Sequence, residues 1–470
     1  MIVMKFGGTS TQDAQAMGNV VRIVKERIDR KPVVVISAIA QATNMLEQAG
    51  RLAADGKSGE ARDTLLKLIE RHYAIADALV KEPQRHRSLR KVIAASLGEL
   101  EDLIKGLAIL RELTPRALDT IYSFGELLSS RIVAAVLEEN GVSAQWLDTK
   151  EFMITDERYN SASPAMDVLK ERLTEIVEPL MQQGIVPVTQ GFIGCTRTGH
   201  RTTMGRESSD YSASVIGAAL DVEDVQIWTD VDGILTADPR VVPSPRKVKV
   251  LSFEEAFDLS FFGAKVLHPK TILPVMGLNI PVHVYNSRRS QLSGSLIAAG
   301  NPKDAPCVKS VAFKRNMTLL TVAPTNRYGP YSFWGHVFNV LTEAGAIAYL
   351  TATSDYGLSI IIDSASESAA IAEALKGIST VTVESGKGIV SLVGSTIRSV
   401  PRLVERVFRS LADTPVSMIS FGASRSNLSL VIDDATVPDA VRSLHDEFFN
   451  GAANETFEVL EHFQAPLQPS

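Results

Sequence analysis

The 470-residue sequence contains very little cysteine, with only Cys195 and Cys307 present. This scarcity excludes a disulfide framework and a metal site built on clustered cysteines, and we expect both residues to be structural thiols. No run of about 18 apolar residues occurs, so the sequence predicts no transmembrane helix. The first residues also lack the apolar core and the small-residue cleavage site of a signal peptide. We therefore expect a cytoplasmic protein without a membrane partner.

Positive charge is also in short supply. The chain has 48 lysines and arginines against 54 aspartates and glutamates, for a formal net charge of −6. This balance argues against nucleic acid or a membrane surface as a partner, so any anionic ligand must be held by a local site. The histidines show no metal-ligand spacing, and we predict no protein-held metal site at His200, His268 or His283.

The pattern of apolar residues predicts an α/β fold. Hydrophobic residues make up 45% of the chain and charged residues 22%, which is typical of a globular protein with a sizeable core. The length predicts about three domains, at roughly 150 residues each. Strands that alternate with helices favour a mainly parallel sheet. The expected strands are Met1–Phe6, Val33–Ile36, Val142–Leu147, Ile185–Gln190, Val225–Trp228 and Pro281–Tyr285, with helices at 12–29 and 171–183 and a helical insertion at 59–110.

The first expected strand leads directly into a pair of glycines. Gly7 and Gly8 follow the strand, and a helical pattern begins near Gln12. Glycines at such a turn let backbone amides approach an anion, and Lys5 supplies positive charge. The order of glycine and lysine is reversed relative to a Walker loop, so this is not that motif. The residues predict a phosphate cradle, although an ordinary tight turn would read the same way.

The stretch from Thr202 to Leu220 is the second candidate element. Gly205 and Arg206 lie in a polar loop, and the good capping residues up to Asp210 lead into a helix of small residues. A helix N-terminus suits an anion, and Arg206 can grip a carboxylate with two parallel hydrogen bonds. Asp210 can orient a cation or a lysine. The alternative is a capped helix with a surface arginine.

Several expected strands end in small, hydroxyl or charged residues. Ser37 and Thr43 follow the second strand, and Thr229 and Asp230 end the Val225–Trp228 strand. The carboxyl ends of parallel strands are where open α/β sheets bind ligands. Further along come the candidate cations Arg240 and Lys265. Together these residues predict an enzyme site that handles phosphates and a small acid.

Glu126 lies in a stretch of small and apolar residues. A carboxylate that is buried there needs a partner, and a ligand's ammonium group would be one. A solvated surface glutamate is the alternative.

The C-terminal third divides into two similar units after a linker at 291–307. Each unit reads βαββαβ, the order of ferredoxin-like folds. The first is expected to run from a strand at 311–322 to a strand at 381–384, and the second from 389–393 to 457–460. Neither unit carries a nucleophile–base pair or a phosphate loop. We interpret them as a sensor, with a passive dimerisation module as the alternative.

Taken together, these stretches resemble the aspartate kinases of the amino acid kinase family over essentially the whole chain. The resemblance implies an amino acid kinase domain at 1–290, a linker at 291–307, and ACT regulatory units at 308–386 and 387–470. The motifs that carry it are Lys5–Ser10, Ser37-Ala38 with Thr43-Asn44, Phe124-Gly125-Glu126, Thr203–Tyr211, Thr229-Asp230, Thr236–Arg240 and Phe262–Pro269.

The resemblance implies transfer of the ATP γ-phosphoryl group to the side-chain carboxylate of L-aspartate. The product would be 4-phospho-L-aspartate, the first step of lysine, threonine and methionine biosynthesis, with ATP and Mg²⁺ as cofactors. A carboxylate acceptor is already ionised at neutral pH, so no general base is needed. The chain would form a homodimer or a higher homo-oligomer and bind an amino-acid effector at the ACT units.

The family's site roles carry over to matching positions. Lys5 would stabilise the transferring phosphoryl group with the Gly7 and Gly8 amides, and Asp210 would organise that lysine or the Mg²⁺. Arg206 would hold a carboxylate of aspartate and Glu126 its ammonium. Hydrogen bonds would come from Ser37, Thr43 and Ser209, and nucleotide contacts from Thr229, Asp230, Leu235, Arg240 and Lys265. Contacts with the effector would come from Phe333, Trp334, Tyr349, Thr353 and Ser354.

Four residues depart from the family pattern. Glu207 and Gln41 replace glycines, and Leu235 replaces a tyrosine near the nucleotide. Tyr349 stands where lysine-inhibited relatives usually carry an aspartate that meets the effector's amine. A phenol supplies no such charge near pH 7, and losing a charged hydrogen bond costs about 1.5–3 kcal/mol. We therefore predict weak, altered or absent inhibition by lysine.

Two rival functions remain open at this stage. A sister kinase acting on glutamate or acetylglutamate is disfavoured by the sensor tandem and by the Phe-Gly-Glu and His-Pro motifs. A non-catalytic amino-acid sensor is disfavoured by the intact Lys5, Arg206 and Asp210, while Glu207 is the one feature in its favour.

Overall fold

The computed structural model describes residues 1–264, 267–300, 307–325, 330–354, 357–363, 365–451 and 456–460. Contacts between residues group the chain into two compact units. The described residues of the first unit are Met1–Gly233 and Leu267–Ala299, and those of the second lie in Ile234–Val266 and Gly300–Ala465. Residues 234–266 thus group with the C-terminal part, although the sequence places them in the predicted catalytic domain.

The sheet of the first unit is mainly parallel, as predicted. Its strands lie in the order β3 (Ala144–Trp146), β4 (Val186–Gln190), β2 (Pro32–Ile36), β1 (Ile2–Phe6), β7 (Asp224–Thr229), β10 (Val282–Asn286) and β11 (Ser295–Ala298). All of these pairs are parallel except β10 with β11. The short strand β11 lies in the segment that the sequence predicts as a linker.

The register of the central strands brings their carboxyl ends to one level. Lys5 pairs with Val35 of β2 on one side and with Ile227 of β7 on the other. All five residues of β1 and all five of β2 are buried. Continuous β-branched and apolar runs of this kind are typical of parallel strands covered on both faces. The polar residues that follow these three strands therefore start from the same edge of the sheet.

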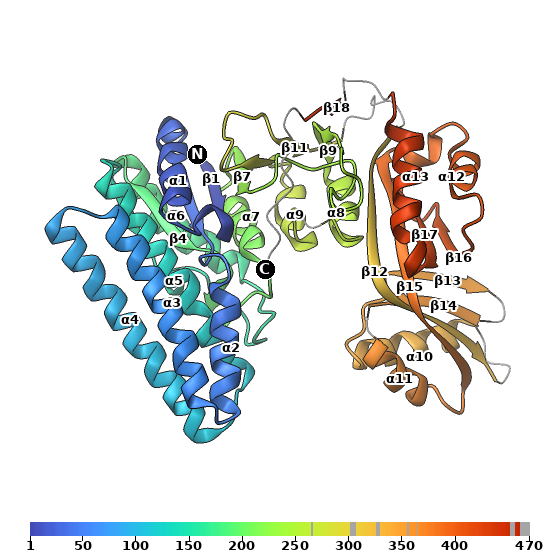
Figure 1. Cartoon of the computed structure of the whole chain (residues 1–470), viewed down its shortest axis with the longest axis horizontal. Helices are drawn as coiled ribbons and strands as arrows, with labels where there is room; N and C mark the ends of the chain where they lie inside the picture. Colours follow the sequence, from blue (N-terminus) through green and yellow to red (C-terminus); the bar gives the residue numbers. More distant parts are fainter. Residues whose placement is uncertain are drawn as a thin grey trace. The chain divides into compact units, whose positions relative to one another are not determined.

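Long helices dominate the first unit, and Figure 1 shows α2, α3, α4 and α5 as a group of long, neighbouring helices. The predicted insertion is confirmed as the helices α3 and α4. The helices of this unit are α1 (Ala14–Glu26), α2 (Ala42–Ala54), α3 (Ser58–Leu79), α4 (Pro83–Leu110), α5 (Pro115–Glu139), α6 (Met166–Gln182), α7 (Ser209–Ala219) and α9 (Pro269–Met276). The sequence did not predict α2, nor the hairpin of β5 (Ile193–Cys195) and β6 (Arg201–Thr203).

Helix α5 is the core helix of this unit. Among the described residues it is the one helix long and apolar enough to cross a membrane by length and composition, and 78% of the relevant window is buried inside the protein. Apolar character all round is typical of a helix surrounded by a protein core.

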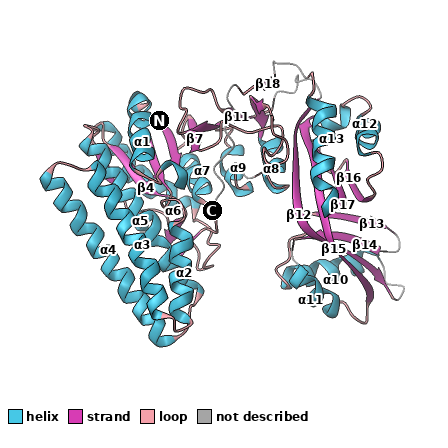
Figure 2. Cartoon of the chain, viewed as in Figure 1, coloured by secondary structure: helices cyan, strands magenta, loops and turns pink. Residues whose placement is uncertain are grey.

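The second unit is built on an antiparallel sheet (Figure 2). Its order is β13 (Leu350–Ser354), β14 (Gly357–Ile362), β12 (Cys307–Pro324), β15 (Ser379–Ser395), β17 (Asn427–Asp433) and β16 (Val416–Phe421). The remaining elements are α8 (Phe253–Phe261), α10 (Pro330–Glu343), α11 (Ala365–Ala374), α12 (Leu403–Leu411), α13 (Val437–Phe449), β8 (Lys247–Val248), β9 (Val250–Ser252) and β18 (Phe457–Glu458).

The predicted last strand of the second βαββαβ unit forms, but its predicted place in the sheet of that unit is wrong. Residues 457–458 form β18, which pairs with β8 instead. The vacant position in the sheet is filled by the first half of β12, because residues 307–314 pair with the second half of β15. A register shift between Lys314 and Met317 then lets the second half of β12 pair with the first half of β15. One long strand therefore serves both ferredoxin-like units.

Candidate active site

The floor of the site is a buried ion pair at the carboxyl edge of the sheet. Lys5 on β1 places Nζ 2.6 Å from Oδ1 of Asp210 in the first turn of α7. The two residues are only 8% and 9% exposed. A buried charge needs a charged partner, so each residue holds the other in place. The structure thus gives Asp210 the lysine partner that the sequence suggested.

Glu126 on α5 is the third ionisable residue of this floor, and it is 3% exposed. Its Oε1 accepts a hydrogen bond from the Ala38 amide at 3.1 Å, whereas Oε2 has no hydrogen-bond partner among the described residues. Burial raises the pKa of Glu126 to about 8, although the Ala38 amide and the charge of Lys5 act in the opposite direction. An orphaned buried carboxylate oxygen is a ready acceptor for a ligand's ammonium group. We call Lys5, Glu126 and Asp210 the buried floor.

Close packing brings Glu126 to the end of β2. A Cβ added to Gly125 would lie 2.8 Å from the Cβ of Ala38, so only glycine lets α5 approach this closely. Ser129, one turn further along α5, donates a hydrogen bond to the carbonyl of Ser37 at 2.8 Å. Ser37 itself is 8% exposed. The loop after β2 is therefore held against the helix that carries Glu126.

The two glycines after β1 have different roles. The Gly7 amide donates to the carbonyl of Trp228 at 3.0 Å, so it continues the sheet and is not available to a phosphate, contrary to the prediction. Gly8 allows a close approach between loops, because a Cβ there would lie 2.9 Å from the carbonyl oxygen of Ala38. Of the predicted amide pair, only Gly8 remains a candidate.

Arg206 is exposed, unlike the three residues of the buried floor. Its side chain is 62% exposed, and its Nη2 donates to Oδ1 of Asn44 at 2.8 Å and to Oε2 of Glu47 at 3.0 Å, both on α2. Burial raises the pKa of Glu47, but hydrogen bonds from Arg51 and Tyr122 outweigh it and hold that pKa below its usual value. The residue predicted to grip aspartate is therefore paired with a carboxylate of the chain itself.

Ser209 and Thr43 both lie in the first turns of helices. Ser209 opens α7 and is 8% exposed, and Thr43 is half-buried near the start of α2. A Cβ added to Gly191, which follows β4, would lie 2.7 Å from the Cβ of Ser209. This glycine thus lets the N-terminus of α7 pack against the edge of the sheet.

The predicted nucleotide residues divide between the two units. Thr229 and Asp230 follow β7 in the first unit, where Thr229 Oγ1 donates to Oδ1 of Asp230 at 3.3 Å. In the second unit Leu235 is 9% exposed, and its carbonyl accepts a hydrogen bond from Ser310. Arg240 is ion-paired with Asp238. Lys265 lies outside the described residues.

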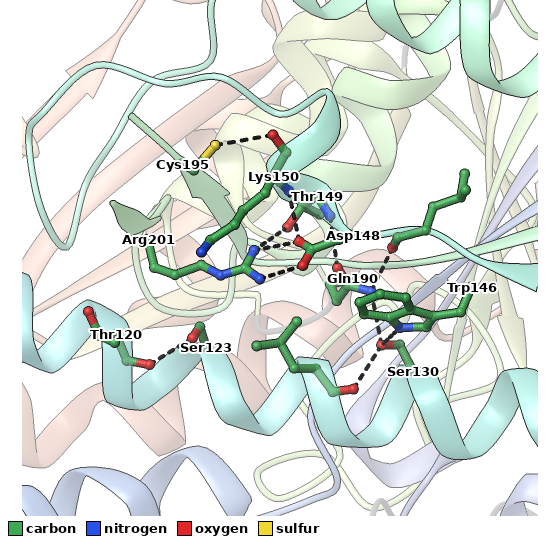
Figure 3. A network of polar contacts seen from close by, with 12 residues as sticks. Thr120, Ser123, Ser130, Trp146, Asp148, Thr149, Lys150, Gln190, Cys195 and Arg201 are labelled. Atoms are coloured by element: carbon green, nitrogen blue, oxygen red, sulfur yellow. Dashed lines mark hydrogen bonds and ion pairs between the residues drawn. The ribbon is translucent and has the colours of Figure 1, made fainter. Parts of the chain in front are cut away.

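A polar network supports the hairpin that precedes α7 (Figure 3). Arg201 on β6 donates from Nη1 and Nη2 to the two carboxylate oxygens of Asp148, each at 2.7 Å. Gln190 at the end of β4 accepts from the Thr149 amide at 3.0 Å and donates to the hydroxyl of Ser130 at 3.0 Å. The paired geometry fixes orientation as well as distance.

Asp119 supports the same segment from α5. Its Oδ1 accepts from the hydroxyl of Thr203 at 2.6 Å, and its Oδ2 accepts from the amides of Thr203 and Asn160, each at 2.9 Å. Burial raises the pKa of Asp119 despite these hydrogen bonds. Sequence reasoning missed this residue, as it missed Arg201 and Asp148, because none of them belongs to a recognisable motif.

With this geometry established, the chain was compared with known proteins. The model of the amino acid kinase family matches residues 1–286, and an ACT domain model matches residues 390–448. Aspartokinase 1, chloroplastic, of Arabidopsis thaliana is 36% identical over 467 residues, which span 95% of this chain and 80% of the relative. The lysine-sensitive aspartokinase 3 of Escherichia coli is 32% identical, over 96% of this chain and 99% of the relative. The chain belongs to the aspartokinases of the amino acid kinase family.

Solved structures agree with this assignment. E. coli aspartokinase III in complex with aspartate and ADP matches with a TM-score of 0.86 at 32% identity, covering 96% of this chain and all of that one. The same enzyme in complex with lysine and aspartate matches with a TM-score of 0.76. The predicted amino acid kinase fold with ACT regulatory units is therefore confirmed.

Two departures from the aspartokinase pattern share one backbone feature. Gln41 has φ of +67° and Glu207 has φ of +62°, in the left-handed region. The family's glycines occupy that region freely, whereas other residues pay about 1–2 kcal/mol there. Glu207 is exposed and Gln41 is half-buried. We call Gln41, Arg206 and Glu207 the exposed rim.

The predicted regulatory residues lie on α10 and on or just before β13. Phe333 on α10 is 3% exposed and packs into the core of the second unit, and its predicted contact with an effector stays a prediction. Trp334 packs against the same core and against the ring of Tyr331. Thr353 and Ser354 end β13 at the edge of the sheet.

Tyr349 has close charged neighbours of its own. Its hydroxyl donates to Oδ2 of Asp363 at 3.0 Å and contacts the ammonium of Lys314, which lies 3.7 Å from the ring centroid. The ring of Phe261 lies 5.0 Å away. Burial and the hydrogen bond to Asp363 raise the pKa of Tyr349, so the phenol stays neutral.

Proposed function

We propose that this chain transfers the γ-phosphoryl group of ATP to the side-chain carboxylate of L-aspartate, giving 4-phospho-L-aspartate. The observation that carries this proposal is the buried floor, where the Lys5–Asp210 pair and the orphaned oxygen of Glu126 lie at one edge of the sheet. The aspartokinase relatives point to the same reaction. We propose that it serves as the first step of lysine, threonine and methionine biosynthesis.

Lys5 stabilises the charge that spreads over the transferring phosphoryl group. Phosphoryl transfer asks a protein mainly for positioning and electrostatic stabilisation, and a buried ammonium is most effective where water is excluded. Asp210 keeps the ammonium at the floor. The acceptor is a carboxylate that is ionised near pH 7, so no residue is required to remove a proton.

Glu126 binds the ammonium of aspartate through the oxygen that lacks a partner. This requires the ionised form, although burial favours the protonated form in the free protein. Arg206 binds the α-carboxylate, and to do so it exchanges the Glu47 carboxylate for that of the substrate. Hydroxyl groups of Ser37, Thr43 and Ser209 supply the remaining hydrogen bonds.

ATP and Mg²⁺ are the proposed cofactors. The described residues contain no group of three histidine, cysteine or acidic side chains that could hold a metal by themselves. Mg²⁺ in such enzymes is usually held by one or two carboxylates together with substrate phosphates and water, so Asp210 suits the role. The ion would neutralise phosphate charge. In the first unit, Thr229 at the end of β7 and Asp230 after it contact the nucleotide.

An amino-acid effector binds the second unit, and the protein acts as a cytoplasmic homodimer or higher homo-oligomer. The E. coli relative has been crystallised with lysine. In this chain the ammonium of Lys314 lies over the ring of Tyr349. The position that would meet the amine of a lysine effector is therefore already next to a positive charge. We therefore keep the prediction that lysine inhibits weakly or not at all, and micromolar inhibition in a lysine titration would contradict it.

The function is tested by ADP release with Mg²⁺-ATP and each of three acceptors. Release that depends on aspartate, and not on glutamate or acetylglutamate, is expected. Turnover with glutamate or acetylglutamate alone would move the chain to a sister activity. A folded protein that binds aspartate yet releases no ADP with any acceptor would favour the sensor function.

A further inference from the structure

Two loops meet directly at the edge of the sheet. We call residues 7–12, after β1, the phosphate loop, and residues 37–41, after β2, the acceptor loop. The Ala40 amide donates to the carbonyl of Gly8 at 3.1 Å, and Gly8 has no room for a Cβ because of Ala38. In the proposed reaction the first loop adjoins the phosphates and the second the carboxylate acceptor. Their separation therefore affects the distance between the reacting atoms.

One side chain from outside the site bonds to both loops. Arg71 extends from α3 and donates from Nη1 to the carbonyl of Ala40 at 2.5 Å and from Nη2 to the carbonyl of Gln12 at 3.1 Å. The residue is half-buried, and burial lowers its pKa while the nearby Asp13 acts in the opposite direction. A planar guanidinium can make both bonds at once with fixed geometry, which a lysine ammonium cannot reproduce.

We propose that Arg71 is a positioning residue that sets the separation of the phosphate loop and the acceptor loop. This inference rests on the proposed function, and it assigns a task in catalysis to the helical insertion of α3 and α4. Arg71 acts through two backbone carbonyls and not through the substrates. A misplacement of about 1 Å between reacting groups can reduce a rate about 100-fold.

The test measures two products, ADP and aspartate hydroxamate, in the same reaction mixture for the wild type and for Arg71→Met. Total ADP measures all phosphoryl transfer, and the hydroxamate formed with hydroxylamine measures transfer to aspartate. The wild type is expected to give about one hydroxamate per ADP. In Arg71→Met the carboxylate no longer lies in line, so transfer to aspartate should fall about 10- to 100-fold, while transfer to water falls less. The ratio of ADP to hydroxamate should therefore rise.

This ratio separates positioning from simple loss of folded protein, because unfolding lowers both products equally. Arg90→Met is the matched control. Arg90 belongs to the same helical insertion, but among the described residues its side chain bonds to Asp77 alone and stacks on Tyr73. It should keep the wild-type ratio. Arg71→Lys keeps the positive charge but cannot make both hydrogen bonds at once, so it should give an intermediate ratio of ADP to hydroxamate. If Arg71→Met does not fold, Arg71→Lys replaces it as the test variant.

Two results would overturn the inference. One is a wild-type ratio in both Arg71 variants. The other is amide hydrogen exchange at residues 8–12 and 38–41 that is no faster in Arg71→Met than in Arg90→Met. The exchange measurement does not depend on turnover. A wild type that makes no hydroxamate would contradict the proposed function, while faster exchange in Arg71→Met alone would still support the link between the loops.

Discussion

Asp210 of the buried floor and Arg206 of the exposed rim lie close together in sequence, yet their charged side chains have different surroundings. Asp210 is 9% exposed and paired with Lys5, whereas the side chain of Arg206 is 62% exposed and paired with Glu47 of a neighbouring helix. The floor is assembled without a ligand. The rim has to exchange one carboxylate for another before it can hold a substrate.

This difference indicates a division of labour. Groups that stabilise transferring charge gain most from being fixed and dry, because nothing then has to reorganise during the reaction. Groups that admit and release substrate must instead be free to move. The left-handed residues Gln41 and Glu207 also lie on the rim, where strain is tolerated. Substitutions in the floor should therefore affect kcat strongly, and substitutions in the rim should affect mainly KM or stability.

Lys5→Met should have the largest effect. Loss of one fixed charge at the transferring group lowers kcat about 100- to 1000-fold. The substitution also leaves Asp210 buried without its cation, which costs about 3–5 kcal/mol of unfolding free energy. Thermal unfolding and initial rates measured on the same preparation separate these two effects.

The matched control is Lys309→Met. Lys309 forms a buried ion pair with Glu255 in the second unit, with Nζ 2.8 Å from Oε2. This variant should lose stability and keep its turnover number. Equal turnover in the two variants would contradict a catalytic role for Lys5.

Glu126→Gln should raise KM for aspartate about 10- to 100-fold, because a charged hydrogen bond is lost. It should also flatten the pH profile. Glu126 is protonated below its pKa of about 8, so in the wild type kcat/KM for aspartate rises as pH increases through that value. A wild-type profile that stays flat between pH 6.5 and 8.5 would exclude Glu126 as the ammonium site.

The same raised pKa makes a stability prediction. The native state holds the proton of Glu126 more tightly than the unfolded state, whose pKa is near 4.5. This stabilising contribution is complete below pH 4.5 and is lost as pH rises through about 8. Denaturant titrations should show that Glu126→Gln lacks this part of the wild-type pH dependence.

Arg206→Gln should raise KM for aspartate about tenfold and change kcat little, since the rim takes part in binding and not in charge stabilisation. Its stability should change by less than about 1 kcal/mol, because exposed ion pairs contribute little. Glu47→Gln breaks the same ion pair but keeps Arg206, which can still donate to Asn44. A rise in KM in both variants would show that the pair itself, and not a free Arg206, matters for binding.

Glu207→Gly should have the smallest effect. Glycine removes the left-handed strain but adds freedom to the unfolded chain, which leaves a net stabilisation of about 0.5–1 kcal/mol. Activity should rise no more than about threefold, as one exposed carboxylate is removed. Glu207→Ala removes the charge and keeps the strain, so only the glycine variant should raise the unfolding midpoint.

The elements that lead to the buried floor could be predicted from the sequence, whereas the contacts of the exposed rim could not. Buried runs such as Val33–Ile36 predicted the central parallel strands, and the residues after them were expected at one edge because parallel strands end together. The partner of Arg206 could not be predicted, because an exposed arginine takes whichever carboxylate the tertiary fold brings near. Arg71 was missed because its helix carries no motif and its bonds are to backbone carbonyls.

The second unit shows a different limit. The sequence predicted a strand at 457–460, and residues 457–458 do form one. Its partner was wrong because strand pairing depends on tertiary contacts and not on local pattern. The sequence predicted 311–322 as a strand of the first ferredoxin-like unit alone. In the structure β12 begins at Cys307, and because of a register shift its two halves belong to the two units.

The most direct test of the central claim is the identity of the product formed by the wild type. The protein is incubated with Mg²⁺-ATP, L-aspartate and hydroxylamine, and the trapped hydroxamate is identified by mass and by position on the carbon chain. We predict the 4-hydroxamate of aspartate, in an amount that matches the ADP released. Aspartate-independent ADP release, or a hydroxamate formed only with glutamate or acetylglutamate, would contradict the assignment of this floor to an aspartate kinase.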